Sequence, residues 1–109
     1  MIKKGDRVGA YISNRDGAVE FLGYGVLSGF ALPKEGVGYV CDSFVKEKRQ
    51  DAVIKLDTGE TVYGCECFWS TEEAVKTVLE KKQIVPVTVA AIRKKKKPET
   101  FPSQVEMFK

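Results

Sequence analysis

The sequence predicts a mostly β fold, an SH3-like small β-barrel of about five strands capped by one helix. Three observations predict it. Apolar and polar residues alternate, with the period of half-buried strands, along four segments: residues 7–12, 18–30, 52–56 and 61–69. Glycines interrupt the second segment at Gly23, Gly25 and Gly29, and strands that curl into a small barrel need such bends. A single capped helical pattern follows near residues 71–82.

The turns between these strands contain residues with defined backbone roles. Asn14-Arg15-Asp16-Gly17 joins the first two strands, because Asn and Asp side chains bond their own backbone and glycine accepts positive φ. Asp57-Thr58-Gly59 joins the next two, with Gly59 suited to the left-handed position of a short hairpin. In the strand after this hairpin, alternation predicts a core face formed by Thr61, Tyr63, Cys65, Cys67 and Trp69.

The predicted helix begins at a capping box. Ser70 can accept a hydrogen bond from the Glu73 amide while the Glu73 side chain bonds back to Ser70. The apolar stripe of the helix is Val75, Val78 and Leu79. After it, the β-branched segment from Ile84 to Ile92 predicts a last strand, with Pro86 at an edge or among its first residues.

The segment from Ala31 to Gln50 is the least regular part of the chain. Pro33, Gly36 and Gly38 interrupt it, so we expect a long loop with a short strand around Tyr39–Cys41. For the core of the whole domain the pattern predicts twelve residues: Val8, Ile12, Phe21, Val26, Ile54, Leu56, Tyr63, Cys65, Trp69, Val75, Val78 and Leu79.

Length and charge predict one domain over residues 1–92 and a C-terminal tail over residues 93–109. Residues 1–92 carry 12 Lys and Arg against 13 Asp and Glu, and residues 93–109 carry 6 against 2, which together give the net charge of +3. The basic run from Arg93 to Lys97 is followed by Pro98 and Pro102, which indicates a tail without its own fold. Such a tail favours weak affinity for polyanions, but it lacks the interleaved aromatics that stack on bases.

Residue types argue against catalysis. The chain has no histidine, which removes the commonest general base near neutral pH, and no Gly-rich phosphate loop with a following lysine. We therefore predict no enzyme, no catalytic residue and no cofactor. The three cysteines are an odd number, which favours a reducing compartment. Cys65 and Cys67 have one residue between them, unlike paired zinc ligands, so we predict core packing and no metal site.

An aromatic and glycine-rich cluster is the candidate binding site. Aromatic faces stack on flat rings, glycines let a ligand approach the backbone, and arginines neutralise phosphates. The ligand-binding residues predicted on this basis are Arg7, Arg15, Tyr24, Gly25, Tyr63 and Trp69. The alternative is that these aromatics simply fill the core of a small barrel.

Three segments resemble a group of small uncharacterised proteins found in bacteriophages and bacterial genomes. They are Gly5-Asp6-Arg7-Val8, Phe21-Leu22-Gly23-Tyr24-Gly25-Val26, and Leu56-Asp57-Thr58-Gly59-Glu60-Thr61-Val62-Tyr63-Gly64-Cys65-Glu66-Cys67-Phe68-Trp69 with the capped helix that follows. The resemblance covers roughly residues 5–85. Relatives tend to have tryptophan at the positions of Tyr63 and Phe68, and often proline at Thr71. The resemblance implies a small accessory protein of viral type, and phage proteins of this size often counter host defence by blocking a protein or sequestering a signalling nucleotide.

Three functional hypotheses follow. The first is a non-enzymatic phage accessory or counter-defence protein that binds or sequesters a small nucleotide-like ligand, with stacking on Tyr24 and Trp69 and phosphate contacts from Arg7 or Arg15. The alternative is a protein-interaction module that inhibits or adapts a host protein through an exposed edge and the C-terminal tail. The third is a nucleic-acid-binding SH3-like domain, suggested only by the basic tail.

We expect a cytoplasmic location, which is the host cytoplasm if the protein is viral. No signal peptide and no apolar segment of membrane-spanning length is evident, so no membrane partner is expected. Barrel edges invite partners, so self-association into a homo-oligomer is also expected as a possibility.

Overall fold

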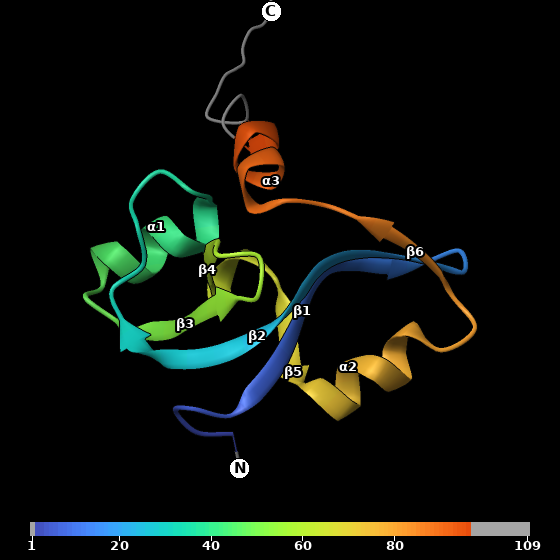
Figure 1. The fold of residues 1–109 in the computed structure, drawn as a ribbon. Coiled ribbons are helices and arrows are strands. Elements are labelled where there is room, and N and C mark those ends of the chain that lie inside the picture. The colour runs from blue at the N-terminus through green and yellow to red at the C-terminus, as the bar shows by residue number, and fades with distance from the viewer. Residues whose placement is uncertain (1, 97–109) are drawn as a thin grey trace, which may run out of the picture.

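The structure, a computed structural model, describes residues 2–96. Within them one six-stranded sheet is combined with three α-helices and one 3-10 turn (Figure 1). The strands are β1 (Arg7–Arg15), β2 (Ala18–Ala31), β3 (Asp51–Leu56), β4 (Thr61–Tyr63), β5 (Phe68–Thr71) and β6 (Gln83–Pro86). The helices are α1 (Tyr39–Lys46), α2 (Glu72–Leu79) and α3 (Val89–Lys96), and the 3-10 turn is η1 (Gly64–Glu66). The predicted mostly β class is confirmed.

The sheet is open, so the prediction of a closed SH3-like barrel is wrong. Its strand order is β4-β3-β2-β1-β5, with antiparallel neighbours, and β6 pairs in parallel with the start of β2. The barrel required one continuous strand over residues 61–69. Instead η1 splits that segment, and its two halves pair with different partners, β4 with β3 and β5 with β1. The two halves therefore lie at opposite ends of the strand order.

The β1–β2 hairpin is the centre of the sheet, because β3, β5 and β6 all pair with one of its two strands. Asp16 and Gly17, at φ 55° and 76°, form its two-residue turn, as the sequence predicts. The pairing register shifts between Ala10 and Ser13, opposite Gly23, which has φ 141°, and shifts again near Gly29. These irregularities bend the ribbon. Bends at these glycines, predicted from the sequence, are therefore confirmed, although the bent ribbon does not close on itself.

Helices cover both faces of this ribbon (Figure 1). On one face α2 contributes Val75 and Leu79, which pack with Val19. On the other face lies the larger core, which α3 covers with Val89 and Ile92. Its buried sheet residues are Val8, Ala10, Leu22, Leu27, Ala52, Ile54, Leu56 and Val62. The ribbon is thus the middle layer between α2 and α3.

Five predicted core residues are buried, namely Val8, Ile54, Leu56, Val75 and Leu79. The predicted core face of residues 61–69 is wrong in its first part: Val62 is buried opposite Ile54, whereas Thr61 is exposed and Tyr63 is only partly buried. Cys67 and Trp69, of the same predicted face, do pack against the larger core. Val26 and Cys65 are also only partly buried. Because η1 changes the backbone direction after β4, strand alternation cannot be carried from Thr61 through to Trp69.

Three helices are present where one was predicted. Residues 39–46, expected to include a short strand, form α1, which begins after Gly38. The expected strand over 84–92 ends at Pro86, which has no N–H to donate, and the chain then forms α3. Thr88 Oγ1 accepts a hydrogen bond from Ala91 N at 3.1 Å and so caps α3. Residues 93–96, expected to belong to the tail, are helical, and the rest of the predicted tail lies outside the described residues.

The predicted α2 helix is present, but its cap is one residue later. Thr71 Oγ1, not the Ser70 hydroxyl, accepts a hydrogen bond from Ala74 N at 3.2 Å. Ser70 is instead part of β5, paired with Gly9. The helix ends at Leu79 rather than near residue 82, because Lys81 adopts a left-handed backbone with φ 58°. Within residues 2–96, none of the helices has the length and apolar character needed to cross a membrane.

Candidate functional site: a basic groove beside α3

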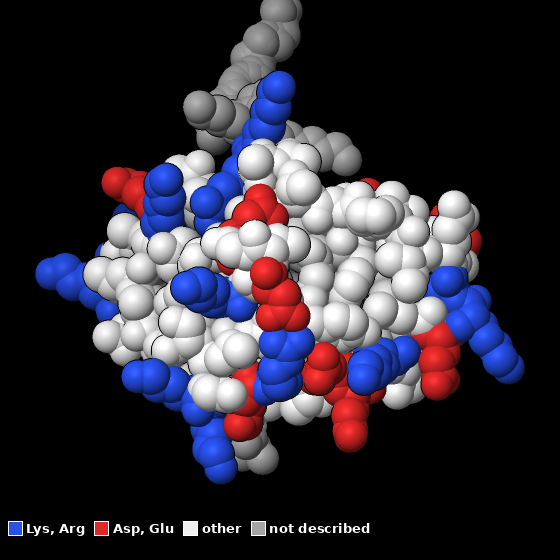
Figure 2. All heavy atoms as spheres, viewed as in Figure 1, with Lys and Arg blue, Asp and Glu red and all other residues white. Residues whose placement is uncertain are grey.

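An open groove of about 500 Å³ lies between α3 and the loop that precedes α1. Its walls come from Lys34 to Val37 on the loop and from Ala90, Arg93 and Lys94 on α3. Basic side chains lie at this end of the molecule with a few acidic ones, and others are spread over the rest of the visible face (Figure 2). The lining itself has three basic side chains and one acidic side chain, Glu35; Arg93 is ion-paired with Glu66 of η1, which leaves a small excess of positive charge.

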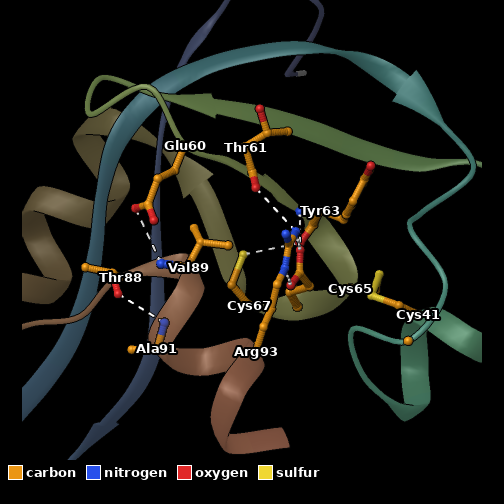
Figure 3. Close-up of polar contacts among 12 residues, drawn as sticks. Cys41, Glu60, Thr61, Tyr63, Cys65, Cys67, Thr88, Val89, Ala91 and Arg93 are labelled. Atoms are coloured by element: carbon orange, nitrogen blue, oxygen red, sulfur yellow. Dashed lines mark hydrogen bonds and ion pairs between the residues drawn. A yellow bond between two sulfur atoms is a disulfide. The ribbon is translucent and has the colours of Figure 1, made fainter. Parts of the chain in front are cut away.

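The turn η1 holds both walls of this groove. Cys65 forms a disulfide with Cys41 of α1, with 5.4 Å between their Cα atoms, and the next residue, Glu66, binds Arg93 of α3 (Figure 3). Cys67 then packs against the core and its Sγ donates to the Tyr63 carbonyl oxygen at 3.7 Å. Cys65, Glu66 and Cys67 therefore connect α1, α3 and the larger core, respectively, at one place in the structure.

The Glu66–Arg93 ion pair is the most buried polar contact of the site. Arg93 Nε and one terminal nitrogen donate to the two carboxylate oxygens of Glu66, each at 2.8 Å. The Glu66 side chain is fully covered. Its carboxylate also accepts from Tyr63 N at 2.9 Å, and Arg93 donates to the Thr61 carbonyl at 3.3 Å. The hydrogen bonds to Glu66 raise the pKa of Arg93 above its ordinary value, against the opposing effect of burial.

Further contacts fix the position of η1 and of α3. Both carboxylate oxygens of Asp51 accept backbone hydrogen bonds, one from Ala52 N and one from Cys65 N. Gly64 has no room for a side chain, because a Cβ there would lie 2.7 Å from Trp69 Nε1. At the start of α3, Val89 N donates to the Glu60 carboxylate at 3.4 Å (Figure 3). These contacts fix η1 and the start of α3, and so the position of the α3 wall of the groove.

Some predicted ligand-binding residues lie together on the α2 side of the sheet. Arg7 donates two hydrogen bonds to Asp57, at 2.8 and 2.7 Å, and one to Glu72 at 3.3 Å. These bonds raise the pKa of Arg7 and lower that of Asp57. Tyr24 meets Phe21 edge to face with 5.0 Å between ring centroids, and burial raises the pKa of the Tyr24 hydroxyl.

The other predicted residues are elsewhere. A Cβ on Gly25 would overlap the Lys55 carbonyl, so Gly25 serves the close approach of β2 and β3. Trp69 packs on the larger core, and Tyr63 lies beneath the Arg93 guanidinium with 6.0 Å from its carbon to the ring centroid. Arg15 is exposed at the end of β1. The structure does not bring the six residues to one cavity.

Sequence analysis missed the residues that line the groove. Lys34 stands in the segment expected to be loop, and Arg93 and Lys94 stand in the basic run expected to be tail. The sequence feature that could have indicated a role for Arg93 is Glu66, an isolated acid between two cysteines in a mostly apolar strand pattern. A charge at such a position needs a partner when buried.

The cysteines also differ from expectation. Cys41 and Cys65 form a disulfide rather than packing as thiols, and Cys65 and Cys67 do not share a strand face, because η1 turns the backbone between them. Among the described residues there is no cluster of three or more potential metal ligands of the His, Cys, Asp and Glu types. Comparison of the chain with protein-family models, with curated proteins and with solved structures finds no match.

Proposed function

We propose that the protein is a non-enzymatic binding protein whose groove beside α3 takes a small anionic ligand of the nucleotide class. The observation that carries the proposal is the pair of exposed lysines, Lys34 and Lys94, on opposite walls of that groove, against the single lining acid Glu35; the charge of Arg93 is balanced by Glu66. A volume of about 500 Å³ is in the range of small-molecule sites.

Each basic residue has a separate role in this proposal. Arg93 is held by Glu66, which balances its charge, and it supplies a fixed wall that does not reorganise when a ligand binds. Lys34 and Lys94 are exposed and lie on opposite walls, so they would contact phosphate oxygens directly.

The non-enzymatic part of the proposal rests on the residue types present. The chain has no histidine, and no basic residue of the groove is paired with a nucleophile. In the phage setting that the sequence resemblance implies, such a protein would act by sequestering a host signalling nucleotide. The amount of ligand removed would then be set by affinity and protein concentration alone.

Isothermal titration against a panel of cyclic and linear nucleotides tests the proposal. The double variant Lys34→Ala/Lys94→Ala should bind the active nucleotide at least tenfold more weakly, about 1.4 kcal/mol. The matched control is Lys55→Ala/Lys76→Ala, which removes the same charge from exposed positions outside the groove. Equal loss in both double variants, or no binding of any nucleotide by the unaltered protein, would overturn the proposal. A DNA or RNA arm whose affinity falls steeply with salt would favour nucleic-acid binding instead.

A second function, a protein-interaction module, is favoured by one observation. β5 lies at the end of the strand order, and its residues Phe68 to Thr71 include no charge that would protect an edge from pairing. Phe68 is 62% exposed and stacks on Tyr11 with 5.6 Å between ring centroids. On this hypothesis Phe68→Asp should abolish capture of a host protein or of a second copy, whereas the groove double variant should not. Deletion of residues 93–109 would not separate the hypotheses, because it also removes Arg93.

A further inference from the structure

We propose that the Cys41–Cys65 disulfide is a redox-sensitive latch that holds the segment from Leu32 to Gln50 against the sheet, and with it the loop wall of the groove. The segment lies between β2 and β3 and contains α1. Only the predicted effect of the disulfide on ligand binding rests on the proposed function. Release of the segment itself is a property of the fold and is tested without any ligand.

The segment has few attachments to the rest of the molecule. Cys41 is the one buried residue of α1, with 1% exposure, and the helix packs chiefly against η1. Before the helix, Pro33 and Val37 are buried. Tyr39 and Val40, at the start of α1, are exposed, at 90% and 51%. The disulfide is therefore the central attachment of α1.

Other strong contacts of the segment are internal to it. Asp42 accepts a hydrogen bond from Gly36 N at 2.8 Å, which braces the groove loop against the first turn of α1. The Arg49 guanidinium lies over the Phe44 ring at 4.5 Å from its centroid. Because both members of each contact belong to the segment, these contacts can persist after release and do not resist it. The loop wall would move together with α1.

η1 has contacts with the rest of the molecule that do not involve the disulfide. η1 remains tied to α3 through Glu66 and Arg93, and to β3 through Asp51 and the Cys65 amide. The larger core takes no residue from α1. Loss of the disulfide should therefore free the segment locally and leave the sheet folded.

The chemistry requires an external dithiol reductant. Cys65 is partly exposed and Cys41 is buried, so a reductant thiolate attacks Cys65 Sγ. The S–S bond breaks, Cys41 leaves as a thiolate and takes up a proton, and a mixed disulfide forms on Cys65. The second thiol of the reductant then displaces Cys65, which is also protonated. The protein gains two electrons and two protons, and the reductant is oxidised to its disulfide. In Figure 3 the Cys67 sulfur lies apart from this disulfide and donates to the Tyr63 carbonyl oxygen, and the reduction uses no exchange with it.

Hydrogen–deuterium exchange of the oxidised and dithiol-reduced full chain tests the latch. Amides of residues 34–46 should exchange roughly tenfold or more faster after reduction, whereas those of β1 and β2 should not change. Unchanged exchange over 34–46 would overturn the proposal. Equal acceleration in β1 and β2 would overturn it too, because the protein would then be unfolding as a whole.

Variants and ligand binding complete the test. Cys41→Ser/Cys65→Ser should match the reduced protein under both conditions, and Cys67→Ser should keep the difference between the two redox states. Loss of the difference in Cys67→Ser would overturn the Cys41–Cys65 assignment. If a nucleotide from the panel binds, the reduced protein should bind it about tenfold more weakly. Equal affinity in both states, with the exchange difference intact, would refute the link to the groove. If no nucleotide binds, the proposed function fails and the exchange result still decides the latch.

Discussion

The Arg93 guanidinium and the Glu66 carboxylate meet through two hydrogen bonds of 2.8 Å, with 26% of the Arg93 side chain exposed and none of that of Glu66. The two residues come from elements far apart in the sequence, α3 and η1. Removing the Arg93 charge would leave the fully covered Glu66 carboxylate without its ion pair, which is strongly unfavourable. The ion pair therefore acts together with the buried Val89 and Ile92 to hold α3, and with it one wall of the groove.

Arg93→Met should lower the free energy of unfolding by about 3 kcal/mol, because the buried Glu66 carboxylate loses its ion pair with Arg93 while the side-chain volume is nearly kept. Urea denaturation followed by circular dichroism measures this change. The matched control is Lys94→Met, the next residue of α3, which is exposed and should change stability by about 0.5 kcal/mol or less. Equal effects of the two substitutions would mean that the ion pair does not hold α3.

The Arg7–Asp57 pair predicts a pH dependence on the opposite side of the sheet. The Arg7 hydrogen bonds lower the Asp57 pKa from its ordinary value of 3.8, so Asp57 stabilises the fold above that value. This stabilisation is lost as the pH falls through the lowered pKa of the folded state. Melting temperatures of the unaltered protein and of Asp57→Asn should therefore differ near pH 6 and converge in strong acid. The pair is exposed, so the difference at pH 6 should be small and should shrink in high salt.

A difference that persisted in strong acid would contradict this interpretation, because Asp57 would then be acting through its shape rather than its charge. Asp16→Asn is the matched control. Asp16 is an exposed aspartate in the β1–β2 turn, so its substitution removes the same charge from a position outside the Arg7 pair.

The cap of α2 gives a prediction that separates the structure from the sequence pattern. Thr71→Ala should destabilise the protein by about 1 kcal/mol, because Ala74 N loses its side-chain acceptor. Ser70→Ala should not remove a cap, since Ser70 pairs with Gly9 inside β5. Thermal unfolding of both variants decides between them. A larger loss in Ser70→Ala would restore the capping box that the sequence predicts.

The sequence pattern correctly predicted the elements that depend on contacts between residues near one another in the sequence. The turn at Asp16 and Gly17 and the buried alternation of Ile54 and Leu56 each depend on neighbours in sequence or on the adjoining strand. These elements were placed correctly from residue type and period. The apolar stripe of α2 was placed correctly for the same reason, although its cap was one residue off.

The elements that the sequence pattern did not predict, η1, α1 and the groove, depend on contacts between segments that are distant in the sequence. η1 interrupts an apparently continuous strand because Glu66 forms an ion pair with Arg93 and Cys65 forms a disulfide with Cys41. The two pairs are separated by 27 and 24 residues in the sequence. Nothing in the strand period around Tyr63 reveals either partner. The glycines before α1 indicated a loop, although Gly38 precedes a helix held by that same disulfide. The groove arises from these long-range links, so its lining could not be found from sequence.

Gly25 connects the predicted glycine pattern with a measurable steric limit. At this position β2 lies so close to β3 that a Cβ would overlap the Lys55 carbonyl and come within 2.7 Å of Leu56 Cα. Both neighbours are backbone atoms of a paired strand, so they cannot rotate away as a side chain could. Gly25→Ala should therefore destabilise the protein by about 2 kcal/mol or more, despite the usual preference of strands for alanine over glycine.

The control for this prediction is Ser28→Ala on the same strand. Ser28 is exposed, and its substitution should change the free energy of unfolding by about 0.5 kcal/mol or less. Urea denaturation of both variants gives the comparison. If Gly25→Ala were as stable as Ser28→Ala, β2 and β3 would have to lie further apart at Gly25 than the structure places them. The glycine would then be available for ligand approach, the role that the sequence pattern suggests for it.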